Sequence, residues 1–527
     1  MKRPLLLAGL AAPLLLTGAP RSFLAHDAGY YALQAHWIEQ SNQWLAPLWF
    51  SEPVFDRCIG AQWLMALSLK LFGGASWAVD VPTLVAAVVS LVLTGWLAQR
   101  LVPARPSTGA LAMVLLALTP LWLNYAHLAT QDMPLLAVEM GGICALAASR
   151  PQGNRWWPLL AGAAPGLAFL IKGFMVALPV LAIAPFVLLE RRWLWRNWAF
   201  WLGVGLGWLP VALWLGLSLH TYGLEVVSGL WQKLLFLSQA DVYAAGPFYY
   251  LWNIPANTAP WIVAALVGWP LLWRSRLDRG GRLVLLLYPL LLLLLLSAFR
   301  TKTPYYGLQL TPSIAIAAAV AIDQWARVLR GWARRIDPLL SATGALVLIA
   351  GWLVAWPGSA LGTAVAEGEG LPPLPVLVMG AAALGLSWLV VPWQPSPARR
   401  LAALLLGPWL ALVLLTQAGL FSDRSPGVRL ALSQPDVQAQ LHRGPIQAAA
   451  DKPLDGAEHA QLILLALATP NTPHQLLKPA DVNPGQAVWI RRSELGDPQQ
   501  WQISVDAPAL QGWVLAQRRT NPAGSAP

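Results

Sequence analysis

Two carboxylates and three cations stand at the ends of apolar segments, where charged side chains are uncommon. Asp27 follows the first apolar segment and Asp132 follows the third, while Arg57, Lys172 and Lys302 are cations outside the arginine clusters. A carboxylate can take a proton from a hydroxyl group, and cations can stabilise a phosphate that gains charge as it leaves. If the apolar segments cross a membrane, all five side chains lie at one water interface. Two carboxylates and three cations at one interface would suit chemistry on a lipid-linked phosphate.

The composition predicts a helical protein that crosses a membrane many times. The chain has 527 residues, of which 57% are hydrophobic and only 11% are charged, whereas soluble domains have about 25% charged residues. Apolar runs of about 18 to 20 residues recur along most of the chain. The net charge of +11 comes largely from arginines in short loops, where positive charge sets membrane orientation. Nucleic-acid binding is therefore not expected.

Arginine clusters alternate with the apolar segments and define one side, which the positive-inside rule places in the cytoplasm. We expect about thirteen transmembrane helices, with a cytoplasmic N-terminus and a C-terminal tail on the opposite side. The first segment also resembles a secretory signal peptide, and this alternative stays open. The expected spans are 4–20, 80–99, 107–125, 134–149, 158–171, 174–190, 198–217, 258–273, 283–298, 306–325, 339–356, 374–392 and 401–420.

Three regions are expected to lie outside, namely the first outer loop, a second large loop at 218–257 and the C-terminal tail, and two of them contain signals of local structure. The first outer loop, 21–79, contains apolar residues at helical spacing in 28–44 and again in 61–72, which predicts two helices lying in the membrane interface. The tail is less hydrophobic, so we divide the chain into a membrane domain, 1–420, and a small soluble α/β domain, 421–527, with a disordered end from Asn521. Its predicted strands are Leu462 to Ala468, Ala487 to Arg491 and Gly512 to Ala516.

Each candidate residue also has a structural explanation. Asp132 stands two residues before Pro134 and fits the N-cap of the fourth segment. Lys172 and Lys302 could reach lipid headgroups along their flexible stems. The two cysteines, Cys58 in an outer loop and Cys144 within a helix, lack the spacing of a metal site, and neither is a candidate nucleophile.

Six segments, in order over residues 1–425, resemble motifs of one family. The segments are His26 to Tyr31, Phe55 to Gly73, Thr130 to Leu135, Gly166 to Pro179, Gly246 to Trp261 and Arg300 to Pro312. They resemble the GT-C-fold glycosyltransferases that use polyprenyl-phosphate sugars. This family includes the dolichyl-phosphate-mannose-protein mannosyltransferases and the bacterial transferases that attach aminoarabinose to lipid A.

The chain departs from the family motifs at three places. The acidic pair of the first motif is reduced to Asp27, and the family lysine of the second is Arg57 without its two following prolines. The histidine expected just before Pro247 is replaced, with Ala244 and Ala245 at this place. In some relatives that histidine helps to hold a metal, so a divalent metal is left open here and no cofactor is expected.

The resemblance implies an inverting transfer of one sugar from a polyprenyl phosphate to a hydroxyl group on the outer face of the cytoplasmic membrane. It assigns Asp27 as the general base, with Asp132 orienting the acceptor or Asp27, or sharing the role of Asp27. It assigns Arg57, Lys172 and Lys302 to the donor phosphate. The expected groove for the sugar or lipid contains Asp56, Tyr249, Tyr250, Tyr305 and Tyr306, although core packing is the alternative for at least two of the tyrosines.

The implied partners are a polyprenyl-phosphate-linked sugar, the lipid bilayer and a lipid, protein or glycan acceptor. A transporter or flippase for lipid-linked sugars is a competing function, but such proteins place charged sites near the bilayer midplane. In this chain the centres of the predicted spans carry almost no charge. Glu139, a few residues inside the fourth span, is the exception. Two more function classes stay open, a non-catalytic envelope assembly protein and a related transferase that moves a longer glycan.

Overall fold

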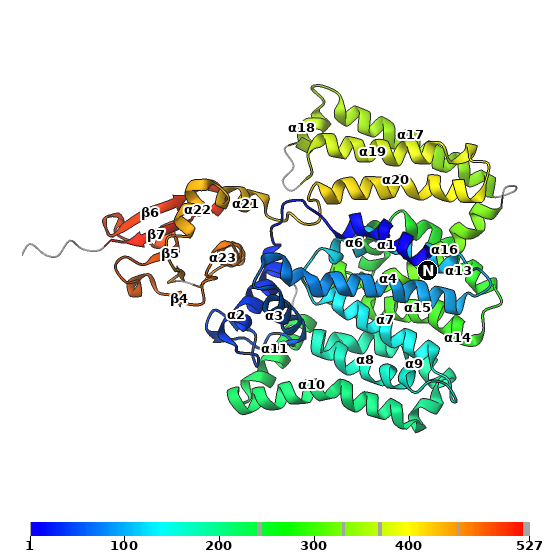
Figure 1. The fold of residues 1–527 in the computed structure, drawn as a ribbon, viewed down its shortest axis with the longest axis horizontal. Helices are drawn as coiled ribbons and strands as arrows, with labels where there is room; N and C mark the ends of the chain where they lie inside the picture. Colours follow the sequence, from blue (N-terminus) through cyan, green and yellow to red (C-terminus); the bar gives the residue numbers. More distant parts are fainter. Residues whose placement is uncertain (1, 240–244, 329–332, 367–370, 452, 520–527) are drawn as a thin grey trace, which may run out of the picture.

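A computed structural model describes residues 2–239, 245–328, 333–366, 371–451 and 453–519. The end predicted to be disordered from Asn521 lies outside these residues. The described chain forms a large helical bundle with a small sheet domain at one end (Figure 1). The predicted combination of a helical part and a small C-terminal domain containing helices and strands is therefore confirmed.

Helices occupy all thirteen of the predicted apolar segments. The elements are α1 Lys2–Leu15, α4 Val81–Leu101, α5 Thr108–Ala117, α6 Pro120–Ala126, α7 Asp132–Ala148, α8 Trp156–Lys172, α9 Ala177–Glu190, α10 Trp198–Tyr222, α13 Trp261–Arg274, a π-helix at Leu283–Leu287, α15 Tyr288–Ala298, α16 Thr311–Arg327, α17 Ala333–Ala355, α19 Leu374–Leu389 and α20 Pro397–Gln417; α14 Arg279–Arg282 precedes the π-helix. The connecting segments contain α11 Glu225–Gln239, α12 Tyr249–Thr258, a 3-10 helix at Pro304–Leu310 and α18 Ala360–Ala366.

The number of helices that could each cross a membrane is lower than thirteen. Among the described residues, eight helical stretches are long and apolar enough, or nine if α5 and α6 form one bent span. Several of the predicted segments contain short helices, such as α1 and α13 with 14 residues each. A helix of that length rises only about 21 Å, less than the hydrocarbon core of about 30 Å.

The apolar stretch from α8 to α9 reverses direction at Gly173, whose φ of 62° lies in the left-handed region. Lys172 at the end of α8 forms an ion pair with Asp132 at the start of α7. Arg191, which follows α9, instead donates to the carbonyl oxygen of Leu146 near the end of α7 (2.9 Å). These two contacts lie at opposite ends of α7. Helices α8 and α9 therefore run in opposite directions.

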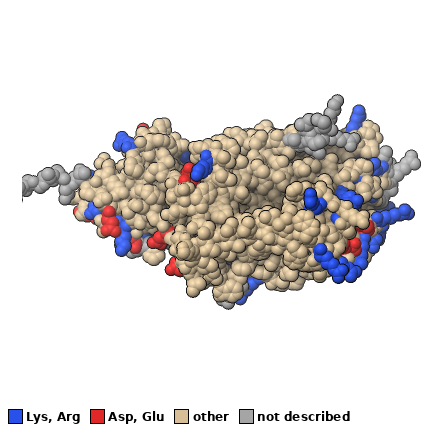
Figure 2. All heavy atoms as spheres, turned by 60° about the horizontal axis from the view of Figure 1, so that its bottom comes forward, with Lys and Arg blue, Asp and Glu red and all other residues tan. Residues whose placement is uncertain are grey.

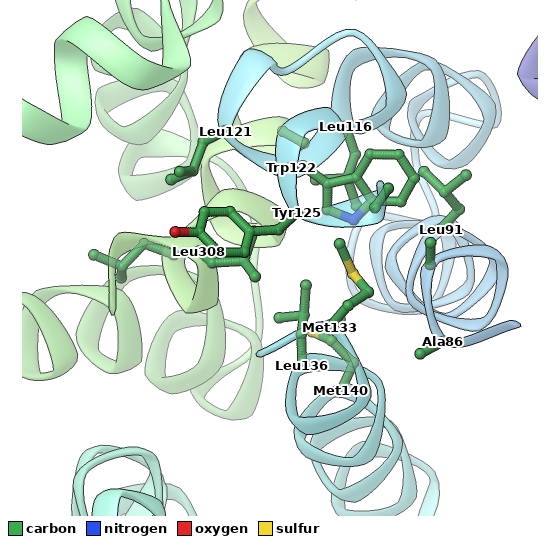
Figure 3. Packing of buried hydrophobic residues seen from close by; sticks show 14 of the residues in the cluster. Ala86, Leu91, Leu116, Leu121, Trp122, Tyr125, Met133, Leu136, Met140 and Leu308 are labelled. Atoms are coloured by element: carbon green, nitrogen blue, oxygen red, sulfur yellow. The ribbon is translucent and has the colours of Figure 1, made fainter. Parts of the chain in front are cut away.

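The core beneath the candidate site is built around the bend between α5 and α6, where the chain turns by 67° before Pro120. Figure 3 shows Trp122 between Leu91, Leu116 and Met133, which come from α4, α5 and α7. The Trp122 indole nitrogen donates to the hydroxyl of a serine on α4 (3.0 Å). The start of α7, which carries Asp132, is thereby held against three other helices.

The arginine-rich loops meet at the end of the bundle farthest from the sheet domain. Figure 2 shows lysines and arginines gathered there, separated from the sheet domain by a broad uncharged belt. Arg105 pairs with Asp323 (3.4 Å), and Arg400 pairs with the buried Asp337 (2.5 Å). Loops far apart in the sequence thus share one face, as the alternation of arginines and apolar segments predicts.

Both predicted helices of the first outer loop are present, as α2 Tyr30–Ser41 and α3 Gly60–Phe72. A two-stranded hairpin, β1 Leu48–Trp49 and β2 Glu52–Pro53, lies between them. Most of α2 is buried, because it packs against α3 on one side and the C-terminal domain on the other. Helix α2 is therefore an internal support and not a helix resting on the bilayer surface alone.

The C-terminal domain contains a five-stranded sheet in the order β4-β3-β5-β7-β6. Strand β3 runs parallel to β4 and β5, while β7 is antiparallel to β5 and β6. The strands are β3 Ile446–Ala449, β4 Leu476–Leu477, β5 Ala487–Arg491, β6 Trp501–Asp506 and β7 Trp513–Arg518, and the helices are α21 Pro426–Leu432, α22 Pro435–Leu441 and α23 Gly456–Ala468.

One of the three predicted strands is wrong. Residues Leu462 to Ala468 belong to helix α23, which lies between the sheet and the first outer loop (Figure 1). Asp455 and Glu458 form a capping box at its start, and leucine and alanine favour a helix over a strand. The other two predicted strands correspond to β5 and β7.

Candidate active site

A cavity of about 340 Å³ opens at the end of the bundle nearest the sheet domain and brings together most of the predicted site residues. Its volume is within the range of sites that hold small molecules. The predicted residues that line it are Asp27, Asp56, Arg57, Asp132, Lys172, Tyr305 and Tyr306. They come from the first outer loop, the start of α7, the end of α8 and the 3-10 helix that precedes α16.

Asp27 presents a carboxylate that is free to take part in chemistry. It lies in a single π-helical turn, Ala25–Gly29, and its side chain is half-buried. Among the described residues, the Asp27 carboxylate has no hydrogen-bond partner. Burial raises the pKa of Asp27 above its usual 3.8, and Asp132 raises it further, while Lys172 and Arg57 oppose the shift. A carboxylate with a raised pKa is a stronger base than an ordinary aspartate.

Lys172 and Asp132 form a buried ion pair beside Asp27. Their side chains are 6% and 8% exposed, respectively. The Lys172 ammonium also lies 4.6 Å from the ring centre of Tyr305 and 5.4 Å from that of Tyr306. The N-cap of α7 is Gln131, so the Asp132 carboxylate holds Lys172 and does not cap the helix. This geometry makes Asp132 a positioning group for the cation.

Arg57 is held as a rigid, oriented fork. Its guanidinium donates two hydrogen bonds to Asp56, from Nε to Oδ1 (2.9 Å) and from Nη2 to Oδ2 (2.6 Å). The guanidinium carbon lies 4.6 Å from the ring centre of Tyr30 and 4.8 Å from that of Tyr31. Because these contacts use one edge of the guanidinium, Nη1 has no partner among the described residues and remains able to bind an anion.

Lys302 is not brought into the cavity. Its ammonium donates to the backbone oxygens of Ser297 (2.9 Å) and Phe299, at the end of α15. A cation at this place satisfies carbonyl groups that have no partner in the helix. The prediction that Lys302 faces the donor phosphate is therefore not supported, and the lysine neither lines the cavity nor extends to the lipid headgroups.

Tyr249 and Tyr250 also lie outside the cavity lining. The Tyr250 hydroxyl donates to the backbone oxygen of Thr303 (3.1 Å), and the residue is 1% exposed. The Tyr249 hydroxyl accepts a hydrogen bond from Asn253 on the same helix (3.1 Å). Of the four predicted groove tyrosines, Tyr250 therefore packs in the core, Tyr249 packs against the core while partly exposed, and the other two line the cavity.

A third cation of the cavity, Lys233, was not predicted from the sequence. This residue lies on the amphipathic helix α11, which contributes Leu230 and Leu234 to the same wall. Burial lowers the pKa of Lys233, while nearby Asp56 acts in the opposite direction. The signal that could have identified it was an isolated lysine among apolar residues in an outer loop, the same signal that identified Lys172.

A close helix crossing positions Lys172. A methyl group added at Gly60 on α3 would lie 2.6 Å from the backbone oxygen of Leu170 on α8. Only glycine allows the two backbones to approach so closely. Since Gly60 follows Arg57 by three residues, this contact fixes the arginine and the lysine relative to each other.

Among the residues that the structure describes, no group of three or more histidine, cysteine, aspartate or glutamate side chains is arranged to hold a metal ion. Cys58 and Cys144 are both free and buried, and Cys58 lines the cavity. The cationic side chains that line this cavity are those of Arg57, Lys172 and Lys233.

Comparisons with known proteins agree with this architecture. Residues 56–216 match the family model described as dolichyl-phosphate-mannose-protein mannosyltransferase. The undecaprenyl phosphate-alpha-4-amino-4-deoxy-L-arabinose arabinosyl transferase of Edwardsiella ictaluri is 27% identical over 60% of this chain and 58% of its own length. The enzyme with the same description from Pseudomonas aeruginosa is 28% identical over 74% of this chain and 71% of its own length.

The match to the Edwardsiella enzyme thus spans less than two thirds of that relative. The crystal structure of ArnT from Cupriavidus metallidurans bound to undecaprenyl phosphate superposes with a TM-score of 0.76 and 18% identity, covering 99% of both chains. The chain is therefore a multi-pass membrane protein with the ArnT fold, and the predicted resemblance to polyprenyl-phosphate-sugar glycosyltransferases is confirmed.

Proposed function

We propose that this protein is an inverting glycosyltransferase that moves one sugar from a polyprenyl phosphate to an acceptor hydroxyl group. The observation that carries the proposal is the cavity in which the unpartnered Asp27 carboxylate lies with Arg57, Lys172 and Lys233. A base and a set of cations in one cavity are what displacement of a lipid phosphate requires. The similarity to enzymes described as undecaprenyl-phosphate aminoarabinose transferases supports the same reaction class.

In the proposed reaction the acceptor oxygen attacks the anomeric carbon of the sugar. The bond between that carbon and the phosphate oxygen breaks, so the configuration inverts in a single displacement. Asp27 takes the proton of the acceptor hydroxyl. The released polyprenyl phosphate gains negative charge, which the fork of Arg57 and the ammonium groups of Lys172 and Lys233 stabilise.

The same proposal assigns roles to the remaining groups. Asp132 and Asp56 hold Lys172 and Arg57 in place through their ion pairs. The rings of Tyr305 and Tyr306 line the wall beside Lys172, where they can contact the sugar. The groups that hold the donor phosphate are all on the chain itself, so the proposed reaction assigns no step to a metal ion.

We further propose that residues 1–420 form the catalytic membrane domain with about thirteen spans, and that 421–527 form a domain outside the cytoplasm. The arginine-rich end of the bundle would face the cytoplasm by the positive-inside rule. The cavity lies at the opposite end, since Asp132 begins α7 and the arginine contacts lie where α7 ends. A donor whose phosphate sits at the outer interface would therefore reach Asp27.

The test is sugar transfer by the purified protein from undecaprenyl phosphate-α-4-amino-4-deoxy-L-arabinose and, in parallel, from other polyprenyl-phosphate sugars, to envelope lipid and glycan acceptors. Asp27→Asn should abolish transfer while leaving donor binding intact, because it removes only the proton acceptor. The matched control is Asp436→Asn, an exposed aspartate on α22. Equal rates for Asp27→Asn and the wild type would remove Asp27 from the mechanism, and an absence of transfer from every donor would refute the proposal.

A further inference from the structure

The C-terminal domain and the first outer loop share one hydrophobic core. This core lies around helix α23, which Figure 1 places between the sheet and the loop. From the loop it contains Ala25, Tyr30, Leu33, Trp37, Leu48 and Phe50, and from α23 it contains Leu462, Ile463, Leu465 and Ala466. The turn that carries Asp27 is therefore packed against a helix more than 400 positions away in the chain.

His26, next to Asp27, makes a direct contact between the two regions. Its Nε2 donates a hydrogen bond to the backbone oxygen of Gly456 at the start of α23 (2.7 Å). Its ring stacks on that of His459, with centres 5.5 Å apart and planes at 8°. His459 stacks in turn on Trp49 of the loop hairpin, at 4.1 Å and 22°. His459 is thus inserted between two rings of the loop.

The backbone behind Asp27 also touches α23. A methyl group added at Gly29 would lie 3.0 Å from Cγ2 of Ile463. Ile463 is fully buried, so this part of the catalytic turn rests directly on the helix. The amide of Gly29 bonds to the oxygen of Leu24 (2.8 Å), which closes the turn over this contact.

Helix α23 also supports Arg57 of the cavity indirectly, through the ring of Tyr30. Tyr30 lies 6.0 Å from the ring of His459 and 4.6 Å from the guanidinium carbon of Arg57. Arg57 also contacts Tyr31 and Asp56, which do not depend on α23 in this way. Loss of His459 should therefore disturb the position of Asp27 more than that of Arg57.

We propose that α23 is a built-in part of the active site, and that His459 and Ile463 are positioning residues that hold the Asp27 turn against the cavity. This inference rests on the proposed function, because it gives the C-terminal domain a role in the same reaction. The soluble domain then acts as the back wall of the catalytic turn and does not serve only as a separate recruiting module.

Kinetics of sugar transfer separate positioning from a general structural effect. His459→Ala should lower kcat about 10- to 100-fold, since small displacements of a catalytic group have effects of this size. KM for the donor should stay near the wild-type value, because Tyr31 and Asp56 still hold Arg57. His459→Phe should restore most of kcat, since a phenyl ring can replace the stacking contacts. The control is His442→Ala, an exposed histidine on the same domain.

Hydrogen exchange of the full-length protein gives a readout that does not depend on activity. The amides of Gly29 and Tyr30, which are bonded within the turn, should exchange about 2- to 10-fold faster in His459→Ala, as expected for lost ring stacking. Peptides from α20 should exchange as in the wild type. An unchanged kcat, or unchanged exchange in the turn, would overturn the inference. If the wild type transfers no sugar, the proposed function fails, and exchange alone decides whether α23 holds the turn.

Discussion

Substitutions in the ion pair between Lys172 and Asp132 should change the stability of the protein and its rate of sugar transfer in different ways. Both side chains are almost fully buried, at 6% and 8% exposed. Removing one partner of such a pair leaves an uncompensated buried charge, with a loss of about 3–5 kcal/mol in the free energy of unfolding. We expect this loss for Lys172→Met. Asp132→Asn should lose less, because the rings of Tyr305 and Tyr306 stabilise the remaining ammonium by roughly 0.5–2 kcal/mol.

The double variant Lys172→Met/Asp132→Asn should recover most of the lost stability, because it leaves no unpaired charge. Its sugar transfer should nevertheless remain as low as that of Lys172→Met, since both lack the cation proposed to bind the leaving phosphate. Asp132→Asn keeps that cation but loses the ion pair that positions it, so donor affinity should fall less than in Lys172→Met. The measurements are denaturant unfolding in detergent micelles and the KM and kcat of sugar transfer for all four proteins.

Two results would refute this reasoning. If the double variant transferred sugar at the wild-type rate, Lys172 would have no part in stabilising the leaving group. If Lys172→Met were as stable as the wild type, the buried pair would not hold the ends of α7 and α8 together. The second result would also remove the role of Asp132 as the group that positions the cation.

The remaining predictions concern single positions. The acid limb of the pH–rate profile should lie above pH 3.8, because burial and Asp132 raise the pKa of Asp27. The same shift makes ionised Asp27 destabilising above its pKa, so Asp27→Asn should be at least as stable as the wild type at pH 7 in denaturant unfolding. Lys233→Ala should raise KM for the donor by removing a cation from the cavity. Lys302→Ala should leave KM unchanged and lower the free energy of unfolding by about 1–3 kcal/mol, because backbone oxygens at the end of α15 lose a donor. Gly60→Ala should lower both stability and kcat, because its methyl group would collide with the backbone of α8, whereas Gly205→Ala, with nothing within 4 Å, serves as the control.

Much of the candidate site could be predicted because its charges are out of place in an apolar chain. Asp27, Arg57, Asp132 and Lys172 stand out for this reason, and all four line one cavity. Lys302 stands out equally, yet its ammonium turns back to the end of the preceding helix, α15. A residue's position at a helix end does not determine the direction of a long, flexible side chain.

Two other differences concern apolar segments whose local signals the predictions did not use. Lys233 is, like Lys172, an isolated lysine among apolar residues in an outer loop, and the packing of α11 over the cavity brings it to the site. The run from Leu462 to Ala468 reads as a buried strand or as a buried helix, because continuous apolar residues have no periodicity to distinguish the two. The capping box at Asp455 was the local signal for the helix.

The sequence by itself determined which segments are apolar, which loops carry arginine and which charges gather at the other interface. These features depend on composition and on spacing along the chain, so they are readable without a structure. Only the tertiary structure decided that Asp132 holds Lys172, that Asp56 orients Arg57 and that α23 supports the turn of Asp27. His26 and Gly456 are 430 positions apart, and contacts at such separations arise from packing of whole elements, which no local pattern specifies.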